Sequence, residues 1–424
     1  MKRELADLTN LSFGMGNIGR LMATNIVPVV AGDSMEYNTR GVLRMTPFKR
    51  QLVTDVRVDV ATFFVPHRHV YGQDWIDYIS EGYDETVNLT TIDAGNGNSW
   101  DEFQAVPWIK SGEIPLWLVQ GYLNIWNRYY RPPKQSIAER TTAYSISGND
   151  AEGFLCSTLP AIWNTGHESG AYPTNNSVSS ATSFTVTDLA KKMAEWDTEL
   201  QREWKDTYYR DFMRNIWGGN ASVDADQRPT LLAHSTKWMS GFDVYGTASS
   251  SFGEAIGRME MLVDHGFPRR LFPEHGVIWT MLLVRTPPTH EEEIHWLVGN
   301  PNPSYAEMAC DPTLVSKEEP YDLELKDVFR STSTTSLGKI PFAQWYRMQP
   351  NIVHKRYDST NGFAFFDTIP ADLQEAVLYP SRRFTSAFRG GGDFLHWQSS
   401  LKNSARCLRV VPDSGSSVFA GTRT

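Results

Sequence analysis

The amino-acid sequence predicts a mainly β protein, and three segments carry most of this prediction. At the start of the segment Val56–Val65, apolar and polar residues alternate with a period of two, which is typical of a strand with one buried face. The block Val277–Val284 is apolar at nearly every position, which favours a strand buried on both faces. Leu401–Val411 alternates again near its start. The aromatic content of 12% and the 23 prolines also fit a β protein with many loops.

The first of these strands is expected to end at Pro66, because proline has no N–H to donate to a sheet. The residues that follow are His67, Arg68 and His69, a triplet that invites a metal-site interpretation. Two histidines two residues apart, without cysteine or carboxylate partners, supply too few ligands for a closed site. We therefore expect no metal there.

A long amphipathic helix is expected to interrupt the β segments. From residue 188 to residue 217 the apolar residues recur every three or four positions, and Gly218-Gly219 supplies a stop. A helix of this length extends for about 45 Å. A stripe of this kind usually packs in a core or a subunit interface. The stripe residues expected to do so include Met193, Trp196, Leu200 and Trp204.

Motifs for nucleotide binding and catalysis are weak or missing. Gly14–Gly19 matches the glycine pattern of dinucleotide-binding proteins, but that pattern requires a helix that begins at the glycines. The following segment, Arg20–Val27, is too short and too rich in β-branched residues for such a helix, and Pro28 ends it. No sequence pattern supplies a nucleophile with its base. We therefore expect neither a cofactor nor an enzyme.

The composition is that of a globular protein of 424 residues, long enough for about two to three ordinary domains. The longest apolar runs are too short to span a membrane, and the N-terminus lacks the apolar stretch of a secretory signal. Three cysteines, Cys156, Cys310 and Cys407, lie far apart in the sequence and indicate reduced thiols rather than a disulfide scaffold.

Several stretches of the chain resemble the major capsid protein of the small icosahedral single-stranded-DNA microviruses. The similar stretches occur in order between about Leu11 and Val411 and are Val58–Trp75, Ile18–Ser34, Gly121–Pro133, Pro268–Pro288, Leu325–Arg330 and Gln344–Arg347. None of these strings is a generic motif. The sequence departs from the family pattern in Glu81–Ile114, in Gln135–Thr187 and after Pro412, which leaves surface features and tail contacts open.

The resemblance implies an eight-stranded antiparallel jelly roll with long loop insertions and one long α-helix. It implies one domain over residues 1–424, with insertions chiefly at about 71–240 and 287–395. The expected function is that of a structural subunit of a T=1 icosahedral shell of 60 copies. This shell would self-assemble through pentamers in the host cytoplasm and enclose single-stranded DNA in the virion.

The resemblance also implies partners. These are other copies of the chain, a spike protein, scaffolding proteins, a small basic DNA-packaging protein, the single-stranded DNA genome and host lipopolysaccharide.

The net charge of −9 argues weakly against a dedicated nucleic-acid-binding protein, but the charges are unevenly distributed. Arg40–Arg50 contains no acidic residue, and Ser381–Arg409 contains Asp393 alone. A shell around a polyanion would place such runs on its inner face, although ordinary solvated surfaces or subunit contacts would also explain them. The residues expected to contact nucleic acid are Lys49, Arg50, Arg382, Arg383 and Arg389.

An alternative function is that of a carbohydrate-binding or carbohydrate-cleaving β protein, since aromatic residues and carboxylates are plentiful. That function would require two carboxylates about 5 to 9 Å apart in a cleft. A shell protein would instead form pentamers or larger assemblies, which size-exclusion chromatography distinguishes.

Overall fold

The structure, a computed structural model, covers most of the chain in separate segments. The residues that it describes are 2–48, 56–81, 88–95, 100–131, 138–146, 153–156, 228–245, 255–286, 292–311, 313, 320–347, 349–354, 388 and 395–411.

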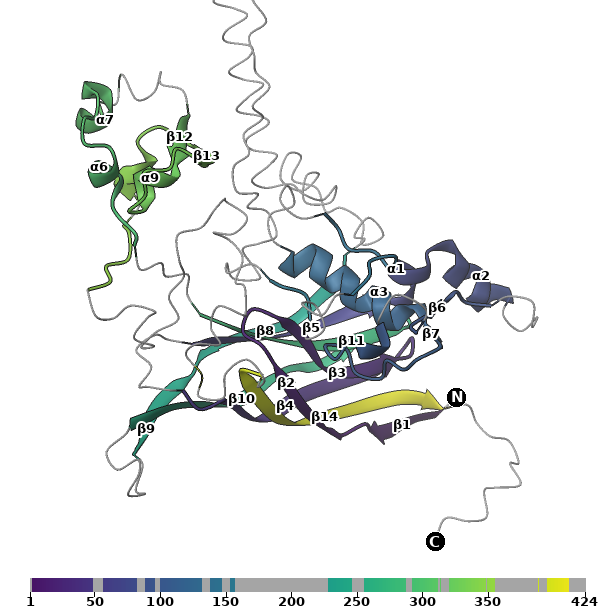
Figure 1. Ribbon diagram of the computed structural model, residues 1–424. Coiled ribbons are helices and arrows are strands. Elements are labelled where there is room, and N and C mark those ends of the chain that lie inside the picture. The colour runs from purple at the N-terminus through teal and green to yellow at the C-terminus, as the bar shows by residue number, and fades with distance from the viewer. Residues whose placement is uncertain are drawn as a thin grey trace, which may run out of the picture.

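Two antiparallel sheets form the centre of the molecule and lie face to face (Figure 1). The six-stranded sheet has the order β1-β14-β4-β10-β9, and β2 also pairs with β14. Its strands are β1 (Lys2–Asp7), β2 (Asn10–Gly16), β4 (Ser34–Met45), β9 (Ser240–Tyr245), β10 (Ala255–Leu271) and β14 (Trp397–Val411). The four-stranded sheet has the order β3-β11-β5-β8. Its strands are β3 (Leu21–Val29), β5 (Arg57–Pro66), β8 (Thr230–Trp238) and β11 (Gly276–Arg285).

The three strands predicted from the sequence are confirmed. Val56–Val65 falls largely in β5, which ends at Pro66 as its missing N–H requires, and all ten residues of β11 are buried. Along β14 the buried positions alternate with the others from Leu401 to Cys407. The glycine pattern at Gly14–Gly19 lies at the end of β2 and the start of the turn to β3, so no helix begins there.

One expectation about β5 is wrong. The alternation predicted an exposed face, yet Asp59 and Ala61 are as buried as their neighbours. A layer of helices covers the outer face of the four-stranded sheet, so both faces of β5 are excluded from solvent.

The space between the sheets contains two apolar clusters separated by polar residues. One cluster includes Leu43, Val60 and Leu282, and the other includes Met35 and Ile278. Between them runs a chain of hydrogen bonds that we call the polar belt. Its residues are Asn25, Tyr37, Thr39, Thr62, Ser235, His265, Thr280 and Asn403.

The hydroxyl group of Tyr37 is the centre of the polar belt and joins the two sheets. It accepts hydrogen bonds from Thr39 of its own strand at 2.6 Å and from Thr280 of β11 at 2.9 Å. It also accepts from Asn25 of β3 at 3.1 Å and donates to Asn403 of β14 at 3.2 Å. A buried hydroxyl without such partners would cost free energy, so these bonds specify how the two sheets are aligned.

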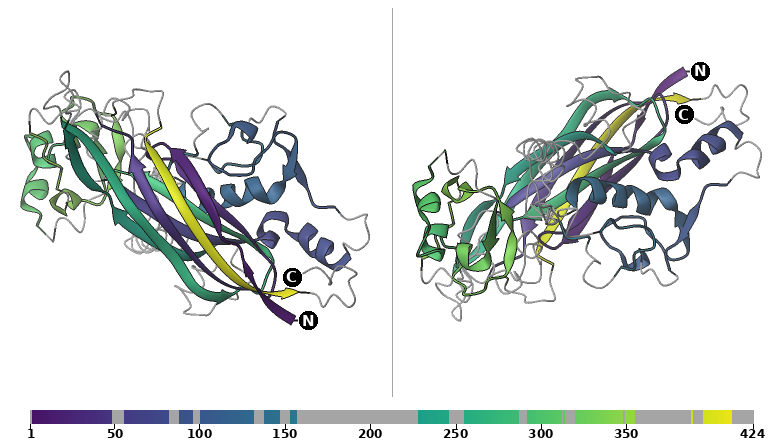
Figure 2. Two further views of the ribbon diagram at one scale, coloured as in Figure 1. Left: turned by 90° about the horizontal axis from the view of Figure 1, so that it is seen from below. Right: turned by 90° about the horizontal axis from the view of Figure 1, so that it is seen from above.

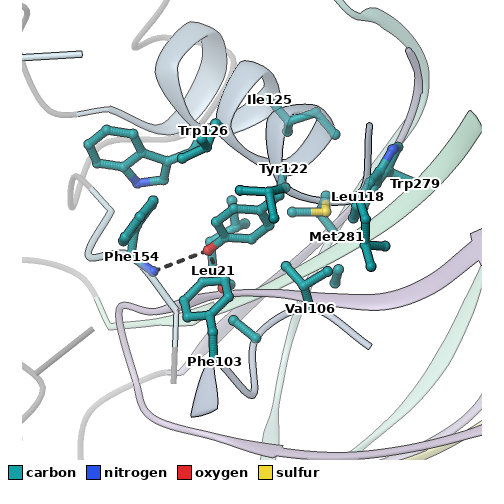
Figure 3. Packing of buried hydrophobic residues seen from close by; sticks show 14 of the residues in the cluster. Leu21, Phe103, Val106, Leu118, Tyr122, Ile125, Trp126, Phe154, Trp279 and Met281 are labelled. Atoms are coloured by element: carbon teal, nitrogen blue, oxygen red, sulfur yellow. Dashed lines mark hydrogen bonds between the residues drawn. The ribbon is translucent and has the colours of Figure 1, made fainter. Parts of the chain in front are cut away.

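Short helices cover the outer face of the four-stranded sheet, as two opposite views show (Figure 2). The elements of this layer are α1 (His67–Tyr71), α2 (Gln73–Glu81), β6 (Thr91–Asp93), η1 (Trp100–Glu102), β7 (Glu113–Pro115), α3 (Leu116–Ile125) and η2 (Trp126–Tyr130). Tyr122 of α3 is fully buried, and its hydroxyl donates to the carbonyl of Leu21 at 2.8 Å. The same hydroxyl accepts from the backbone N–H of Phe154 at 3.1 Å, which ties helix, sheet and loop together (Figure 3).

A second group of small elements lies apart from the sheets, at the end near β9 in Figures 1 and 2. It comprises α6 (Trp296–Gly299), α7 (Tyr305–Ala309), β12 (Tyr321–Glu324), α9 (Leu325–Val328), β13 (Ser336–Ile340) and η4 (Gln344–Arg347). The indole rings of Trp296 and Trp345 stack at 4.2 Å in a small core of its own.

The long helix expected at residues 188–217 lies outside the described residues and stays a prediction. No helix in the described segments is long and apolar enough to cross a membrane.

Candidate functional site

The site residues predicted from the sequence all lie outside the described residues. They are Lys49, Arg50, Arg382, Arg383 and Arg389 for nucleic acid, and Met193, Trp196, Leu200 and Trp204 for packing. Their immediate neighbours Phe48 and Phe388 are described and form an isolated antiparallel bridge, with ring centroids 4.9 Å apart. Two basic runs that are distant in the sequence therefore approach each other at this bridge.

The side of the six-stranded sheet that faces away from the four-stranded sheet is not covered by any of the described helices (Figure 1). We call it the outer sheet face. It is formed by the outward side chains of β2, β14, β4 and β10, which are Leu11, Phe13, Met15, Gln398, Ser400, Lys402, Ser404, Arg406, Glu36, Asn38, Arg40, Val42, Arg44, Glu260, Leu262 and Asp264.

Cross-strand ion pairs neutralise one side of the outer sheet face. Arg40 lies opposite Asp264 in the β4–β10 register and contacts it at 3.2 Å. Arg44 lies opposite Glu260 and contacts it at 3.5 Å. All four side chains are at least half exposed, so each pair contributes little to stability, typically about 0 to 1 kcal/mol.

The other side of this face carries cations without such partners. Lys402 and Arg406 point outward from β14, and within the described segments neither has a carboxylate within 4.0 Å. Together with Arg40 they line an open hollow of about 510 Å³. The lining also contains the side chains of Asn38 and Ser404, which supply hydrogen-bonding groups beside the cations.

The triplet His67, Arg68 and His69 forms α1 and is held by packing and an ion pair. Arg68 contacts Glu274 through two hydrogen bonds, at 3.0 and 3.2 Å, and these bonds lower the pKa of the Glu274 carboxyl group. The ring of His67 lies 4.7 Å from that of Trp75, and burial lowers its pKa to about 4. The described segments contain no cluster of three or more histidine, cysteine or acidic side chains placed to hold a metal ion.

A buried ionic cluster between β5, β8 and β11 was missed by sequence reasoning. Asp59 is completely buried and forms an ion pair with Arg285, which is also buried. Its carboxylate also accepts hydrogen bonds from Arg57 at 3.1 Å and from Thr236 at 2.5 Å. These contacts satisfy a charge that would otherwise be costly to bury. The sequence places Arg57 and Asp59 two residues apart on one strand, but only the β5–β11 register brings Arg285 beside them.

Ser235 and His265 have the contact expected of a nucleophile and its base, yet their surroundings oppose catalysis. The hydroxyl of Ser235 lies 2.8 Å from Nδ1 of His265, and the other ring nitrogen contacts the hydroxyl of Thr62 at 2.9 Å rather than a carboxylate. Burial lowers the pKa of His265 to about 4, which makes it a weak base at neutral pH. The pair is part of the polar belt and serves packing.

The three cysteines are all free. Burial raises the pKa of Cys156 well above its ordinary value and that of Cys407 to about 11, so neither thiol is activated as a nucleophile.

Comparison with known proteins identifies the family of the chain. Residues 1–154 and 134–419 match the family described as Capsid protein (F protein). The chain is 36% identical over 417 residues to capsid protein F of Escherichia phage G4, covering 97% of this chain and 96% of the relative. It is 35% identical to capsid protein F of Enterobacteria phage phiK and 34% identical to that of Escherichia phage alpha3, each over 99% of this chain and 98% of the relative. The chain therefore belongs to the F-protein family of microvirus capsid proteins.

Proposed function

We propose that the chain is the subunit of a T=1 icosahedral shell of 60 copies, which assembles through pentamers and encloses single-stranded DNA. The observation that carries this proposal is the similarity to three proteins named capsid protein F over nearly the whole length of the chain. Self-association is the activity of such a subunit. Many contacts of modest strength allow errors to dissociate, while the closed shell persists through multivalency.

We also propose that the core is an eight-stranded jelly roll in one domain with long insertions. The strand order supports this proposal. If β2, β3, β4, β5, β8, β10, β11 and β14 are numbered one to eight along the chain, the sheets have the orders 1-8-3-6 and 2-7-4-5. This arrangement of paired Greek keys is the jelly-roll pattern found in viral capsid domains. Of the insertions proposed at about 71–240 and 287–395, the first then ends before the core strand β8 and includes α2 to η2, and the second includes the small group from α6 to η4.

The partners are proposed on the same basis. They are a spike protein, scaffolding proteins, a small basic DNA-packaging protein and the genome, with assembly in the host cytoplasm, and host lipopolysaccharide is proposed as a contact of the mature virion. Met193, Trp196, Leu200 and Trp204 are proposed to pack the long helix against the shell.

The assembly proposal is tested with the full-length protein by size-exclusion chromatography with light scattering, followed by electron microscopy together with its viral partners. We expect pentamers from the isolated protein and closed particles from the mixture. A protein that is folded by circular dichroism but stays monomeric at every concentration, and forms no particle with its partners, contradicts the proposal.

A further inference from the structure

We propose that Trp108 of one subunit inserts into an apolar hollow on a second copy of the chain, and that the second copy returns the same contact. The two copies are then related by a two-fold axis, as are subunits of neighbouring pentamers in a T=1 shell. This inference rests on the proposed function, and it names the residues through which one pentamer holds the next.

Trp108 combines two unusual properties. It is a large apolar residue with an exposed fraction of 57%, and its φ of 71° lies in the left-handed region. That region is uncommon for residues other than glycine, and for a bulky side chain it costs free energy. Strain of this kind persists only where the surrounding structure enforces it, and it is concentrated at binding and catalytic sites.

The residues on either side of Trp108 show how its backbone is held. Phe103 and Val106 point into the buried cluster beside α3 (Figure 3). The backbone N–H of Ala23 donates to the carbonyl of Ala105 at 2.8 Å. Ile109, directly after Trp108, packs against the same cluster. The chain is therefore anchored before and after Trp108, and the left-handed conformation between the anchors places the indole ring on the surface.

An open hollow of about 730 Å³ lies beside this loop. Gln104 forms part of its wall, and four residues of chain span at most about 14 Å, so the hollow and Trp108 belong to one patch of the surface. Trp108 does not line the hollow of its own chain. The volume is in the range of pockets that enclose small ligands, roughly 300 to 1,000 Å³, so a single indole ring fits.

The walls of the hollow match the chemistry of an indole ring. Phe13 and Met15 supply apolar surface, and a thioether sulfur makes favourable contacts with aromatic rings. Arg44 can stack its guanidinium group on the face of a tryptophan while it stays paired with Glu260. Gln398 can accept a hydrogen bond from the indole N–H, which usually has a partner when it is buried. Each part of a tryptophan side chain thus has a complementary group.

The closeness of ring and hollow determines the symmetry of the contact. A subunit that carries a knob and its hole on opposite sides forms rings or filaments. A patch that carries both instead forms a two-fold contact, in which each copy fills the other. Contacts within a pentamer are of the first kind, and two-fold contacts between pentamers are of the second. Trp108 is therefore assigned to the joining of pentamers rather than to their formation.

The test uses the full-length protein with its viral partners, and follows pentamers by size-exclusion chromatography and closed particles by electron microscopy. Trp108→Gly removes the ring and suits a left-handed backbone, so its urea midpoint should equal or exceed that of the wild type. We expect pentamers but at least about tenfold fewer closed particles, as the loss of a tryptophan anchor implies. The matched control is Trp238→Ala, which replaces a 55% exposed tryptophan at the end of β8 outside the hollow, and should change neither reading.

A second variant closes the hollow instead of removing the ring. Ser400 is exposed and lies between Phe13 and Val42 in the registers of β14 with β2 and β4. Ser400→Phe should fill the hollow and reduce particle formation as Trp108→Gly does. Ser404→Phe adds the same ring to the same side of β14 outside this hollow, and should leave particle formation unchanged.

A mixture of the two variants tests whether the contact is reciprocal. A Trp108→Gly copy keeps an open hollow and a Ser400→Phe copy keeps its indole ring, so one of the two insertions can still form between them. Pentamers of the two variants are labelled with different dyes and followed by fluorescence cross-correlation. The mixed pair should associate more strongly than a two-colour sample of either variant alone.

The outcomes separate this inference from the proposed function. If either variant forms particles like its control, the inference is overturned while the shell proposal stands. If a variant loses pentamers at an unchanged urea midpoint, the patch forms contacts within a pentamer and the inference is overturned. If both variants lose particles but the mixed pair gains no association, the ring and the hollow contact different partners, and the inference is again overturned. If the wild-type protein forms no assemblies at all, the proposed function fails and this inference fails with it.

Discussion

At the level of single residues, the buried imidazole of His265 couples the stability of the sandwich to pH. Burial lowers its pKa from 6.5 to about 4. In the unfolded chain the ring takes up a proton near pH 6.5, whereas in the folded protein it stays neutral until about pH 4. The unfolded state therefore binds more protons in this interval. Stability is complete above pH 6.5 and falls as the pH decreases toward 4, by at most about 3 kcal/mol for this group.

His265→Gln should make the stability of the protein less dependent on pH. Glutamine can still form hydrogen bonds in the polar belt but takes up no proton. Urea midpoints at pH 7.5 and pH 4.5 should differ less for this variant than for the wild type. Some difference will remain, because burial also lowers the pKa of His396 to about 4. The control is His354→Gln, which replaces an exposed histidine. An equal fall in midpoint for His265→Gln and wild type would show that this ring does not contribute.

At the level of elements, the contact between α3 and β11 depends on the absence of one side chain. A Cβ atom at Gly121 would lie 2.8 Å from the indole of Trp279, which is completely buried. Alanine stabilises a helix by about 1 kcal/mol relative to glycine, but overpacking a core typically costs about 1 to 3 kcal/mol of stability. The steric cost should be the larger, because a rigid buried ring has no room to move.

Gly121→Ala should therefore lower the free energy of unfolding, by up to about 2 kcal/mol after the helix gain is subtracted, measured from chemical denaturation. Gln120→Ala is the control on the adjacent position of the same helix. It removes only a hydrogen bond to Asn124 four residues on, and should change stability by less than about 0.5 kcal/mol. An increase in stability for Gly121→Ala would mean that α3 and β11 are less tightly packed than the structure shows.

Some strands can be predicted from the sequence and others cannot. The inward polar residues of the polar belt are one reason for this difference. β5, β11 and β14 were predicted because long apolar or alternating runs mark them. β10 also alternates, but His265 occupies an inward position, and a polar residue there interrupts the apolar pattern. The partners that make this burial possible, Thr62 and Ser235, lie on other strands. Their proximity follows from the register of distant segments, which no local pattern contains.

At the level of the whole molecule, the basic residues predicted from the sequence lead to a test of genome contact. Replacing Arg382 and Arg383 with alanine should reduce the DNA retained by opened particles, because two predicted phosphate contacts would be removed, while pentamers still form. Retained DNA is measured at increasing salt, and pentamers by size-exclusion chromatography. If pentamers are lost first, these arginines form subunit contacts instead.

The acid-poor runs were a useful but coarse guide to the charged surface. They contain Arg40, Arg44, Lys402 and Arg406 of the outer sheet face, none of which was selected from the sequence. The composition of one sequence segment cannot show that Arg40 and Arg44 form ion pairs with acidic residues of β10. Nor can it show that Lys402 forms no such pair within the described segments. That distinction depends on which strand lies beside which.

The pairing of β1 with β14 has a consequence for the timing of protein synthesis. β14 lies between β4 and the two N-terminal strands, so the centre of the six-stranded sheet comes from the end of the chain. At about 5 to 20 residues per second, a ribosome needs roughly 20 to 80 s to reach Val411, and β14 is the last of the described strands to leave it. Until then β4, β1 and β2 have no neighbour on that side. A chain released early by a stalled ribosome would therefore lack the strand that joins its sheet, and only finished translation products would be able to enter a particle.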